Sequence, residues 1–256
     1  MHPIFFSMGK LHIYWYGVLF GCAYIVPALL AAWRAWMEDV PVATILDFAR
    51  YLFLFGVLGG KLAFALTDWS AFIAGFQFEG LASLKEGWVF YGGALCAAGG
   101  AYLVARARKI EYWRPMDFLT SAAPLGHAIG RIGCFLAGCC YGTPTGLPWA
   151  VRFPPAHPTH GIPVHPTQLY EVAGNLALFG ALTWMLPRRR FKGQIFCWYV
   201  IGYAVLRFFV EDVRADNPHR WPGALTDSQF VAIFCIAAAI PLMRRLRGAS
   251  YGHDTP

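Results

Sequence analysis

The chain has 256 residues, of which 57% are hydrophobic and only 14% are charged. Soluble domains carry about 25% charged residues, so this composition excludes an ordinary soluble protein and predicts an integral membrane protein. The formal net charge of +7 does not indicate nucleic-acid binding, because most of the basic residues lie in short loops beside apolar segments, where they orient membrane proteins.

Seven apolar segments are each close to the roughly 20 residues that a helix needs to cross a bilayer. They cover residues 11–33, 47–67, 88–106, 115–136, 166–187, 193–212 and 225–243. We therefore expect an all-α, polytopic membrane protein with about seven transmembrane helices in a single domain, residues 1–256. The first segment is too long for the core of a signal peptide and lacks a basic flank, so no removable signal is expected.

Lysine and arginine are distributed unevenly between the two sets of loops. Loops 34–46, 106–114 and 188–192 and the tail from Arg244 hold 12 of them, whereas the first ten residues and the other loops hold 5. The positive-inside rule places the first set in the cytoplasm. The N-terminus is then periplasmic and the C-terminus cytoplasmic, as an odd number of crossings requires.

The loop at 137–165 is the longest on the expected periplasmic side. It is rich in proline, glycine and histidine, which argue against a long helix there. We expect it to form a small head between the fourth and fifth spans.

Three polar residues recur every four positions in the sixth segment: Tyr203, Arg207 and Glu211. They therefore lie on one face of a helix, and Arg214 falls near the same face. A charge at membrane depth costs roughly 2.5–3.5 kcal/mol. This pattern predicts a polar chamber that faces an anionic ligand within the bilayer.

A second basic residue at membrane depth is Arg131, in the fourth segment, and His127 is four residues before it. An arginine can direct two hydrogen bonds onto one phosphate, so Arg131 and Arg207 together resemble a phosphate clamp. Two alternatives remain open: Arg207 forms a structural ion pair with Glu211 or Glu171, and His127 is a hydrogen-bonded packing residue.

The fifth segment opens with the sequence HPTQLYE. Pro166 suits the first helical position, with His165 near the N-cap, and Gln168, Glu171 and Asn175 then share one face. A helix N-terminus favours anions, which supports an anion site. The alternative is a buried hydrogen-bond network at the start of a polar helix.

Three of the seven cysteines, Cys134, Cys139 and Cys140, lie close together in the sequence. Structural zinc sites usually pair one C-x₂₋₄-C element with a second, and the second is missing here, so we expect no metal and no cofactor. A nucleophilic cysteine, a disulfide and simple packing residues among glycines remain open alternatives.

Motifs along nearly the whole chain are similar to those of the prolipoprotein diacylglyceryl transferase family. They are PIFFSMGKLHIYWYGVLFG, FGVLGGKLAFAL, FYGGALCAAGG, GRIGCFLAGCCYG, HPTQLYE and IGYAVLRFFVEDVR. The resemblance implies a bacterial inner-membrane enzyme that moves the diacylglyceryl group of phosphatidylglycerol onto the lipobox cysteine thiol of a prolipoprotein. Glycerol phosphate leaves and a thioether forms. We expect a monomer.

The resemblance assigns roles to individual residues of this sequence. The essential arginines of the family match Arg131 and Arg207. Its tyrosine in the first span matches Tyr16, and the tyrosine and acid of its sixth span match Tyr203 and Glu211. The histidine before its Pro-Ser/Thr-Gln motif matches His165. We add Gln168, Glu171, Arg214 and Cys134 as expected substrate-binding residues.

The chain departs from the family at three positions. Tyr91 stands where the family has a histidine that has been regarded as a catalytic base, Cys134 replaces the signature asparagine, and Cys139 replaces an acid. His127, one turn from Arg131, is our candidate for the missing base, with Tyr91, His165 and Glu211 as the alternatives. Three other functions remain open: a paralogue with another acceptor, a transporter or lipid-binding protein without catalysis, and a thiol- or metal-dependent protein.

Overall fold

A computed structural model describes residues 4–8, 11–79, 89–215, 219–221 and 225–251. Two compact units are present. The first comprises Met1–Arg34 and Asp117–Pro256, and the second comprises Ala35–Met116. The expected residues of the site, apart from Tyr91, belong to the first unit.

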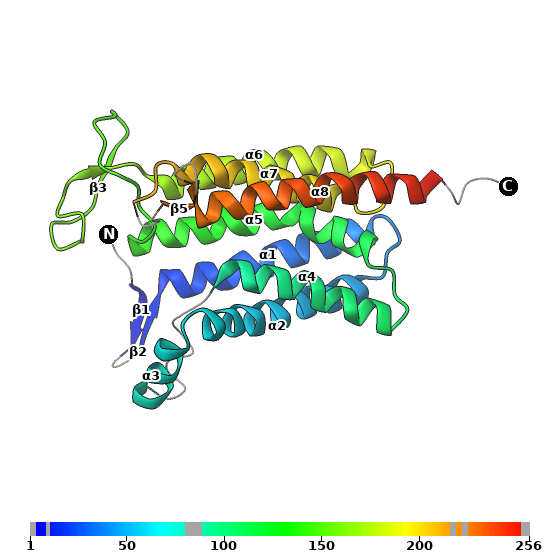
Figure 1. The fold of residues 1–256 in the computed structure, drawn as a ribbon, viewed down its shortest axis with the longest axis horizontal. Coiled ribbons are helices and arrows are strands. Elements are labelled where there is room, and N and C mark those ends of the chain that lie inside the picture. The colour runs from blue at the N-terminus through cyan, green and yellow to red at the C-terminus, as the bar shows by residue number, and fades with distance from the viewer. Residues whose placement is uncertain (1–3, 9–10, 80–88, 216–218, 222–224, 252–256) are drawn as a thin grey trace. The chain divides into compact units, whose positions relative to one another are not determined.

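Long helices dominate the described residues (Figure 1). Those of 18 residues or more are α1 (Trp15–Trp36), α2 (Val42–Thr67), α4 (Phe90–Ala107), α5 (Trp113–Ala137), α6 (Thr167–Met185), α7 (Gln194–Glu211) and α8 (Asp227–Tyr251). Five of them, α1, α2, α6, α7 and α8, are long and apolar enough to cross a membrane. The chain is thus a helical, multi-pass membrane protein, and the crossings by α4 and α5 stay predictions.

Two of the expected spans open with a short strand before their helix begins. Leu11–Tyr14 is a strand, β2, that pairs with β1 (Ile4–Met8), so the first helix begins at Trp15. Leu225–Thr226 is likewise a strand, β6, which pairs with β5 (His219–Trp221) before α8 begins at Asp227. Hydropathy reports burial in an apolar medium and not backbone conformation, so it could not separate these strands from the helices that follow them.

The segment at 68–87, which we expected to be a loop, contains a helix, α3 (Trp69–Glu79). Its start is fixed by Asp68, whose Oδ1 accepts hydrogen bonds from the Ala71 amide and the Ser70 hydroxyl, both at 3.0 Å. A short polar side chain before the first turn is a strong helix start. Position 88, where the third span was expected to begin, lies outside the described residues.

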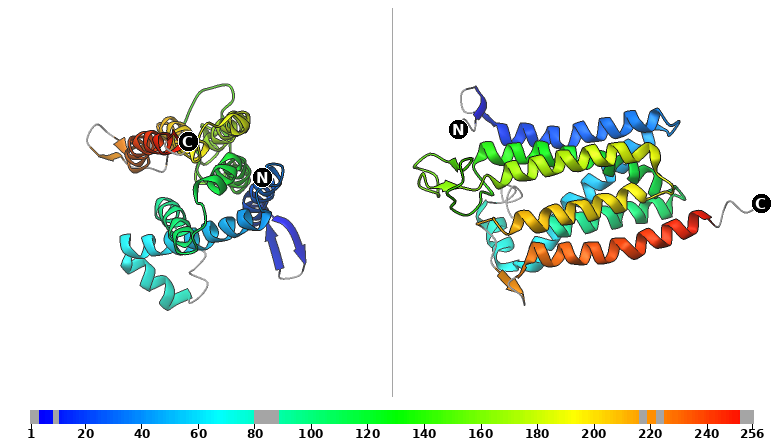
Figure 2. Two further views of the ribbon diagram at one scale, coloured as in Figure 1. Left: turned by 90° about the vertical axis from the view of Figure 1, so that its right-hand side faces the viewer. Right: turned by 90° about the horizontal axis from the view of Figure 1, so that it is seen from above.

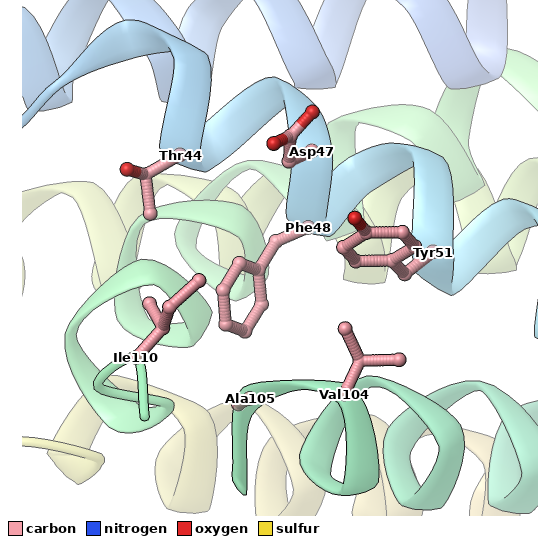
Figure 3. A pocket seen from close by; sticks show the side chains of 7 residues that line it. All are labelled: Thr44, Asp47, Phe48, Tyr51, Val104, Ala105 and Ile110. Atoms are coloured by element: carbon pink, nitrogen blue, oxygen red, sulfur yellow. The ribbon is translucent and has the colours of Figure 1, made fainter. Parts of the chain in front are cut away.

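Within the second unit, α2 and α4 pack closely through small residues. A Cβ added to Gly59 would lie 2.2 Å from the Cβ of Cys96, so no larger residue fits at this contact. One small cavity, of about 40 Å³, lies in this unit (Figure 3) and is lined by Thr44, Asp47, Phe48, Tyr51, Val104, Ala105 and Ile110. Ligand pockets usually measure about 300–1,000 Å³, so we assign this cavity no role in binding.

Within the first unit, α1, α5, α6, α7 and α8 run side by side (Figure 2). Asp117 at the start of α5 fixes the start of α7, because its carboxylate accepts hydrogen bonds from the amides of Gly193, Ile195 and Phe196 at 2.8–3.0 Å. Asp117 is fully buried. A helix N-terminus leaves several amides without intrahelical partners, and this one side chain satisfies three of them.

The loop between α5 and α6 carries two short antiparallel strands, β3 (Val151–Arg152) and β4 (Pro163–Val164). It is joined to the end of α7 by a bridge between Gly142 and Arg214 and by a hydrogen bond from the Thr143 amide to the Val213 carbonyl, at 2.9 Å. The loop that we expected to form a head is therefore anchored beside the C-terminal end of α7. Its periplasmic position stays a prediction.

Candidate functional site

A buried carboxylate, Glu171 on α6, gathers the arginines of three other segments. Arg131 Nε on α5 lies 2.6 Å from its Oε2, and Arg207 Nη1 on α7 lies 2.9 Å from its Oε1. Arg214, just past α7, contacts the same Oε1 at 3.6 Å. The two arginines that were expected to bind phosphate are thus brought to one point, with Glu171 between them.

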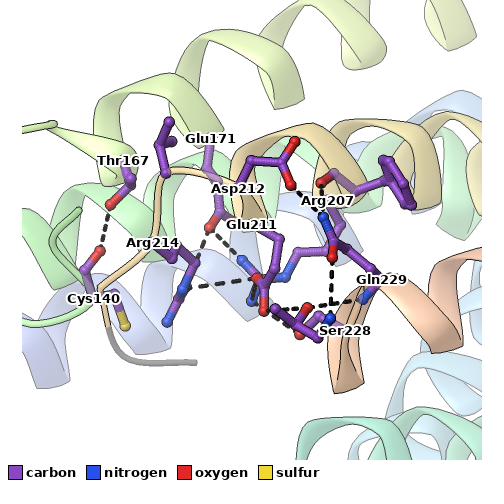
Figure 4. Close-up of polar contacts among 12 residues, drawn as sticks. Cys140, Thr167, Glu171, Arg207, Glu211, Asp212, Arg214, Ser228 and Gln229 are labelled. Atoms are coloured by element: carbon purple, nitrogen blue, oxygen red, sulfur yellow. Dashed lines mark hydrogen bonds and ion pairs between the residues drawn. The ribbon is translucent and has the colours of Figure 1, made fainter. Parts of the chain in front are cut away.

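A second carboxylate, Glu211, continues this network along α7 (Figure 4). Its Oε2 lies 2.7 Å from Arg207 Nη2 and 3.9 Å from Arg214 Nε, and its Oε1 accepts a hydrogen bond from the Thr226 hydroxyl at 3.2 Å. The ion pairs of Arg207 with Glu211 and Glu171, which were an open alternative to the clamp, are therefore present. They do not exclude the clamp, because among the described residues three arginines face these two carboxylates, an excess of one positive charge.

The burial of this network makes it costly to break. Glu171 and Glu211 are each 2% exposed, and removing one partner of a buried ion pair costs about 3–5 kcal/mol. Arg207 also donates to the Ser228 hydroxyl at 3.4 Å. Neither Thr226, the last residue of β6, nor Ser228, in the first turn of α8, was predicted as a site residue.

The first turn of α6 holds the loop that follows α5. Thr167 Oγ1 donates to the Cys140 carbonyl and Gln168 Nε2 to the Cys139 carbonyl, both at 2.6 Å. The predicted helix start is off by one residue, because Pro166 is the N-cap and Thr167 is the first helical residue. The proline ring restricts φ and removes a backbone donor, which suits both the N-cap and the first helical position.

The predicted polar face of α6 is confirmed, since Gln168, Glu171 and Asn175 are all buried. Asn175 Nδ2 donates to the Glu171 carbonyl at 2.8 Å. Among the described residues, Gln168 Oε1 and Asn175 Oδ1 have no hydrogen-bond partner. A buried acceptor without a partner costs about 1–3 kcal/mol, so this face retains hydrogen-bonding capacity that the described chain does not fill.

His127 lies one turn before Arg131 and packs against two tyrosines of α7. Its Nε2 is 2.9 Å from the Tyr199 hydroxyl, and its ring centroid is 4.6 Å from that of Tyr203. The packing role that we left open for His127 is therefore present. Tyr199 was missed, although it continues the four-residue spacing of Tyr203, Arg207 and Glu211 by one turn.

Three thiols form a cluster where α5 ends. The sulfur atoms of Cys134, Cys139 and Cys140 all lie within 4.8 Å of one another. Hydrogen bonds from the Cys134 and Cys139 thiols, together with the nearby Arg214 and Arg131, hold the pKa of the Cys140 thiol below its ordinary value. The hydroxyl of Tyr16 on α1 is close enough to act electrostatically on all three thiols and on Arg131.

His165 and Tyr91 are two further expected site residues. His165 Nδ1 is 3.2 Å from the Tyr170 hydroxyl, which also accepts a hydrogen bond from Trp149 Nε1 at 2.8 Å. Tyr91 is in α4 of the other unit and is half-buried there. The structure therefore gathers Arg131, Glu171, Arg207, Glu211 and Arg214 in direct contact and gives His165 a separate set of partners.

Comparison with known proteins identifies relatives over almost the full length of the chain. A model of the family described as prolipoprotein diacylglyceryl transferase matches residues 3–245. Phosphatidylglycerol–prolipoprotein diacylglyceryl transferases from Finegoldia magna and Clostridium tetani are each 34% identical to it. The matches cover 94% of this chain and 94% and 96% of those proteins. The enzyme of the same name from Nitratidesulfovibrio vulgaris is 32% identical over 98% of this chain and 96% of its own length.

Proposed function

The chain belongs to the prolipoprotein diacylglyceryl transferase family, and we propose that it transfers the diacylglyceryl group of phosphatidylglycerol to the lipobox cysteine thiol of prolipoproteins. The observation that carries this proposal is the meeting of Arg131 and Arg207 on Glu171. The family match supplies the reaction, and the arginines supply a binding site for its phosphate.

The charge of the network suits a lipid phosphate. With Arg214, three guanidinium groups face two carboxylates in the part of the site that the structure describes, an excess of one positive charge. The phosphate diester of phosphatidylglycerol carries one negative charge. It would neutralise the site by taking over hydrogen bonds that Arg131 and Arg207 now direct at Glu171.

The reaction replaces a carbon–oxygen bond by a carbon–sulfur bond. The acceptor thiol loses its proton and its sulfur attacks the glyceryl carbon that bears the phosphate. The bond from this carbon to the phosphate oxygen breaks, and glycerol phosphate leaves with the electron pair. Negative charge grows on the leaving phosphate, where preorganised arginines stabilise it in a site of low dielectric constant.

A base must receive the proton that the lipobox cysteine thiol loses. His127 is our candidate, because it lies one helical turn from Arg131 and its Nε2 is already in a hydrogen bond with Tyr199. Tyr91 and Glu211 are the alternatives. Tyr16, Tyr203, His165, Gln168, Arg214 and Cys134 are proposed to contact the substrates.

We also propose a location for the protein and its site. The distribution of basic residues places the N-terminus in the periplasm and the C-terminus in the cytoplasm of the bacterial inner membrane. Seven crossings, with α4 and α5 included, satisfy that orientation. The loop at 137–165 would then lie on the side where a prolipoprotein presents its cysteine, and the protein would act as a monomer.

The direct test incubates the purified protein with phosphatidylglycerol vesicles and a lipobox peptide, and measures the thioether product by mass spectrometry. A peptide with serine in place of the acceptor cysteine is the control. We expect product from the cysteine peptide only, together with release of glycerol phosphate. No product, under conditions where the Clostridium tetani relative is active, would contradict the proposal.

A further inference from the structure

The three clustered thiols have the geometry of an incomplete metal site. Their sulfur atoms are mutually within 4.8 Å. Zinc binds thiolate sulfur at about 2.3 Å, which places the ligands of a tetrahedral ion about 3.8 Å apart. Small side-chain rotations are therefore enough to bring Cys134, Cys139 and Cys140 onto one ion.

The backbone is held in an unusual conformation to produce this cluster. Cys140 has a φ of 61°, a value that residues other than glycine rarely adopt, and Gly138 has a φ of 78°. A non-glycine residue in this region costs about 1–3 kcal/mol, and such strain is concentrated at functional sites. These two residues turn the chain at the end of α5, so that the two later cysteines lie beside Cys134.

The surrounding chain holds this strained turn in place. The carbonyls of Cys139 and Cys140 are bound by the side chains of Gln168 and Thr167, which are almost completely buried. The contacts with α6 engage backbone oxygens and not sulfur. The turn is thus fixed independently of the sulfur atoms, as a preorganised binding site requires. The thiols contact one another, and Cys139 Sγ lies 3.7 Å from the Cys134 carbonyl, so a metal ion would replace these contacts.

The charge around the thiols also suits a metal thiolate centre. Three thiolates with one divalent ion carry one net negative charge, and Arg131 and Arg214 both lie close enough to act on the cluster. A disulfide is neutral, uses only two of the sulfurs and leaves the third without a role. The three-sulfur arrangement therefore favours a metal over a disulfide.

We propose that Cys134, Cys139 and Cys140 bind one zinc ion and leave its fourth position open for the acceptor cysteine thiol. This inference rests on the proposed function for the identity of the fourth ligand. Catalytic zinc sites typically have three protein ligands and one open position. A thiol that coordinates zinc gives up its proton, and the thiolate is the nucleophilic form of cysteine.

This site would activate the acceptor thiol, and His127 would stay the candidate for receiving its proton. The acceptor thiol binds zinc and releases its proton to a nearby base or to water. Its sulfur then uses one electron pair to form the bond to the glyceryl carbon, and the bond from that carbon to phosphate oxygen breaks. Glycerol phosphate departs from the arginines, and the neutral thioether, a weaker ligand than a thiolate, leaves the zinc.

The test uses Co²⁺, which replaces zinc in thiolate sites and gives a strong sulfur-to-metal absorption band in the near ultraviolet. Reduced, purified wild-type protein is titrated with Co²⁺, and we expect this band to saturate at one equivalent. The variants Cys134→Ser, Cys139→Ser and Cys140→Ser should each lose most of the band. Cys22→Ser and Cys235→Ser, which change thiols elsewhere on α1 and α8, should keep it.

A second measurement tests the open position. Adding a lipobox peptide to the cobalt-loaded protein should intensify the band, because a fourth sulfur joins the ion, whereas the serine peptide should leave it unchanged. Circular dichroism and thermal unfolding of each variant establish that it is folded. If a folded wild-type protein shows no band, or if the protein isolated from cells without reductant holds a disulfide among these cysteines, the zinc inference is overturned.

The two proposals fail separately. Transfer to the peptide at an unchanged rate after chelation and in Cys139→Ser would overturn the zinc inference and leave the transferase intact. A cobalt band that responds to the peptide, with no transfer from phosphatidylglycerol, would contradict the transferase and support the metal site.

Discussion

The Nε atom of Arg131 lies 2.6 Å from Oε2 of Glu171, and both side chains come from helices with apolar surroundings. Glu171 also binds Arg207, so one carboxylate keeps two guanidinium groups from repelling each other in a medium of low dielectric constant. The same carboxylate occupies the donors that a lipid phosphate would need. In the proposed function, the lipid phosphate would therefore have to replace Glu171 as the partner of these arginines.

We expect Glu171→Gln to lower the stability of the folded protein. We also expect anionic lipid to stabilise this variant more than it stabilises the wild type. The neutral amide leaves Arg131 and Arg207 without their shared counter-charge, at a cost of about 3–5 kcal/mol. A lipid phosphate bound between Arg131 and Arg207 would supply the negative charge that the variant lacks. Thermal unfolding in detergent, with and without phosphatidylglycerol, should therefore show a larger stabilisation by lipid in the variant than in the wild type.

The partly exposed Asp47, which pairs with Arg50, provides the matched control for that measurement. Asp47→Asn should change neither the midpoint nor the response to lipid. An equal lipid response in Glu171→Gln and wild type would show that the phosphate does not bind at these arginines.

Arg207→Lys should retain the charge and lose most of the activity. Arg207 uses Nη1 for Glu171 and Nη2 for Glu211, and a single ammonium group cannot reproduce two diverging, directed contacts. Loss of one directed donor to a developing charge costs about 10²–10³ in rate. We expect a decrease of about 100-fold in kcat, measured with phosphatidylglycerol vesicles and a lipobox peptide.

The exposed Arg50 offers the comparison, because Arg50→Lys also shortens an arginine in an ion pair, and no substrate contact is assigned to Arg50. Its rate should equal that of the wild type. A wild-type rate in Arg207→Lys would refute the clamp.

His127→Ala should slow transfer by more than tenfold if His127 receives the proton of the acceptor thiol, since a positioned base typically contributes 10²–10⁴-fold. Tyr199→Phe removes only the hydrogen bond to His127 Nε2 and should have a smaller effect. The transfer rates of both variants and of the wild type are measured at saturating lipid and peptide. Equal rates in His127→Ala and wild type would leave His127 with its packing role and direct attention to Tyr91 and Glu211.

Gly142→Ala should displace segments that position the arginine network, although Gly142 is not itself one of its residues. The added Cβ would lie 2.5 Å from the Val213 carbonyl, 2.6 Å from the Cβ of His165 and 2.8 Å from Cγ2 of Thr167. Overpacking of this kind costs about 1–3 kcal/mol, and here it would push apart the loop, the end of α7 and the start of α6. We expect lower activity and a lower unfolding temperature.

Gly146→Ala, in the same loop, is the matched control, because nothing lies within 4 Å of the position of its added Cβ. It should behave as the wild type in both measurements. A comparable loss in both variants would point to general sensitivity of the loop, and not to the contact at Gly142.

Asp117→Ala should destabilise the protein without a direct effect on chemistry. Three amides at the start of α7 lose their acceptor. Loss of a helix cap and the burial of unsatisfied donors together cost about 2–3 kcal/mol. The unfolding temperature should fall clearly. Below that temperature, the KM for phosphatidylglycerol should stay within about twofold of the wild-type value. Asp47→Ala, the control, should change neither the unfolding temperature nor the KM.

The sequence by itself determined the helical membrane class, the approximate position of each long helix and the polar stripe on α7. These features depend on local quantities, namely the length of apolar segments and the spacing of Tyr203, Arg207 and Glu211. The helix ends were less certain, because β2 and β6 use the same apolar residues as the helices that follow them.

Only the tertiary structure decided which charges meet. Both the clamp and the ion pairs were compatible with the sequence, and the packing of α5, α6 and α7 brought Arg131 and Arg207 to the same carboxylate. It also brought together Cys134, Cys139 and Cys140, for which the sequence showed only half of a metal motif. A sulfur cluster of this kind depends on the positive φ of Cys140 and on carbonyls held by Thr167 and Gln168. Contacts between residues so far apart in the chain leave no periodic pattern in the sequence.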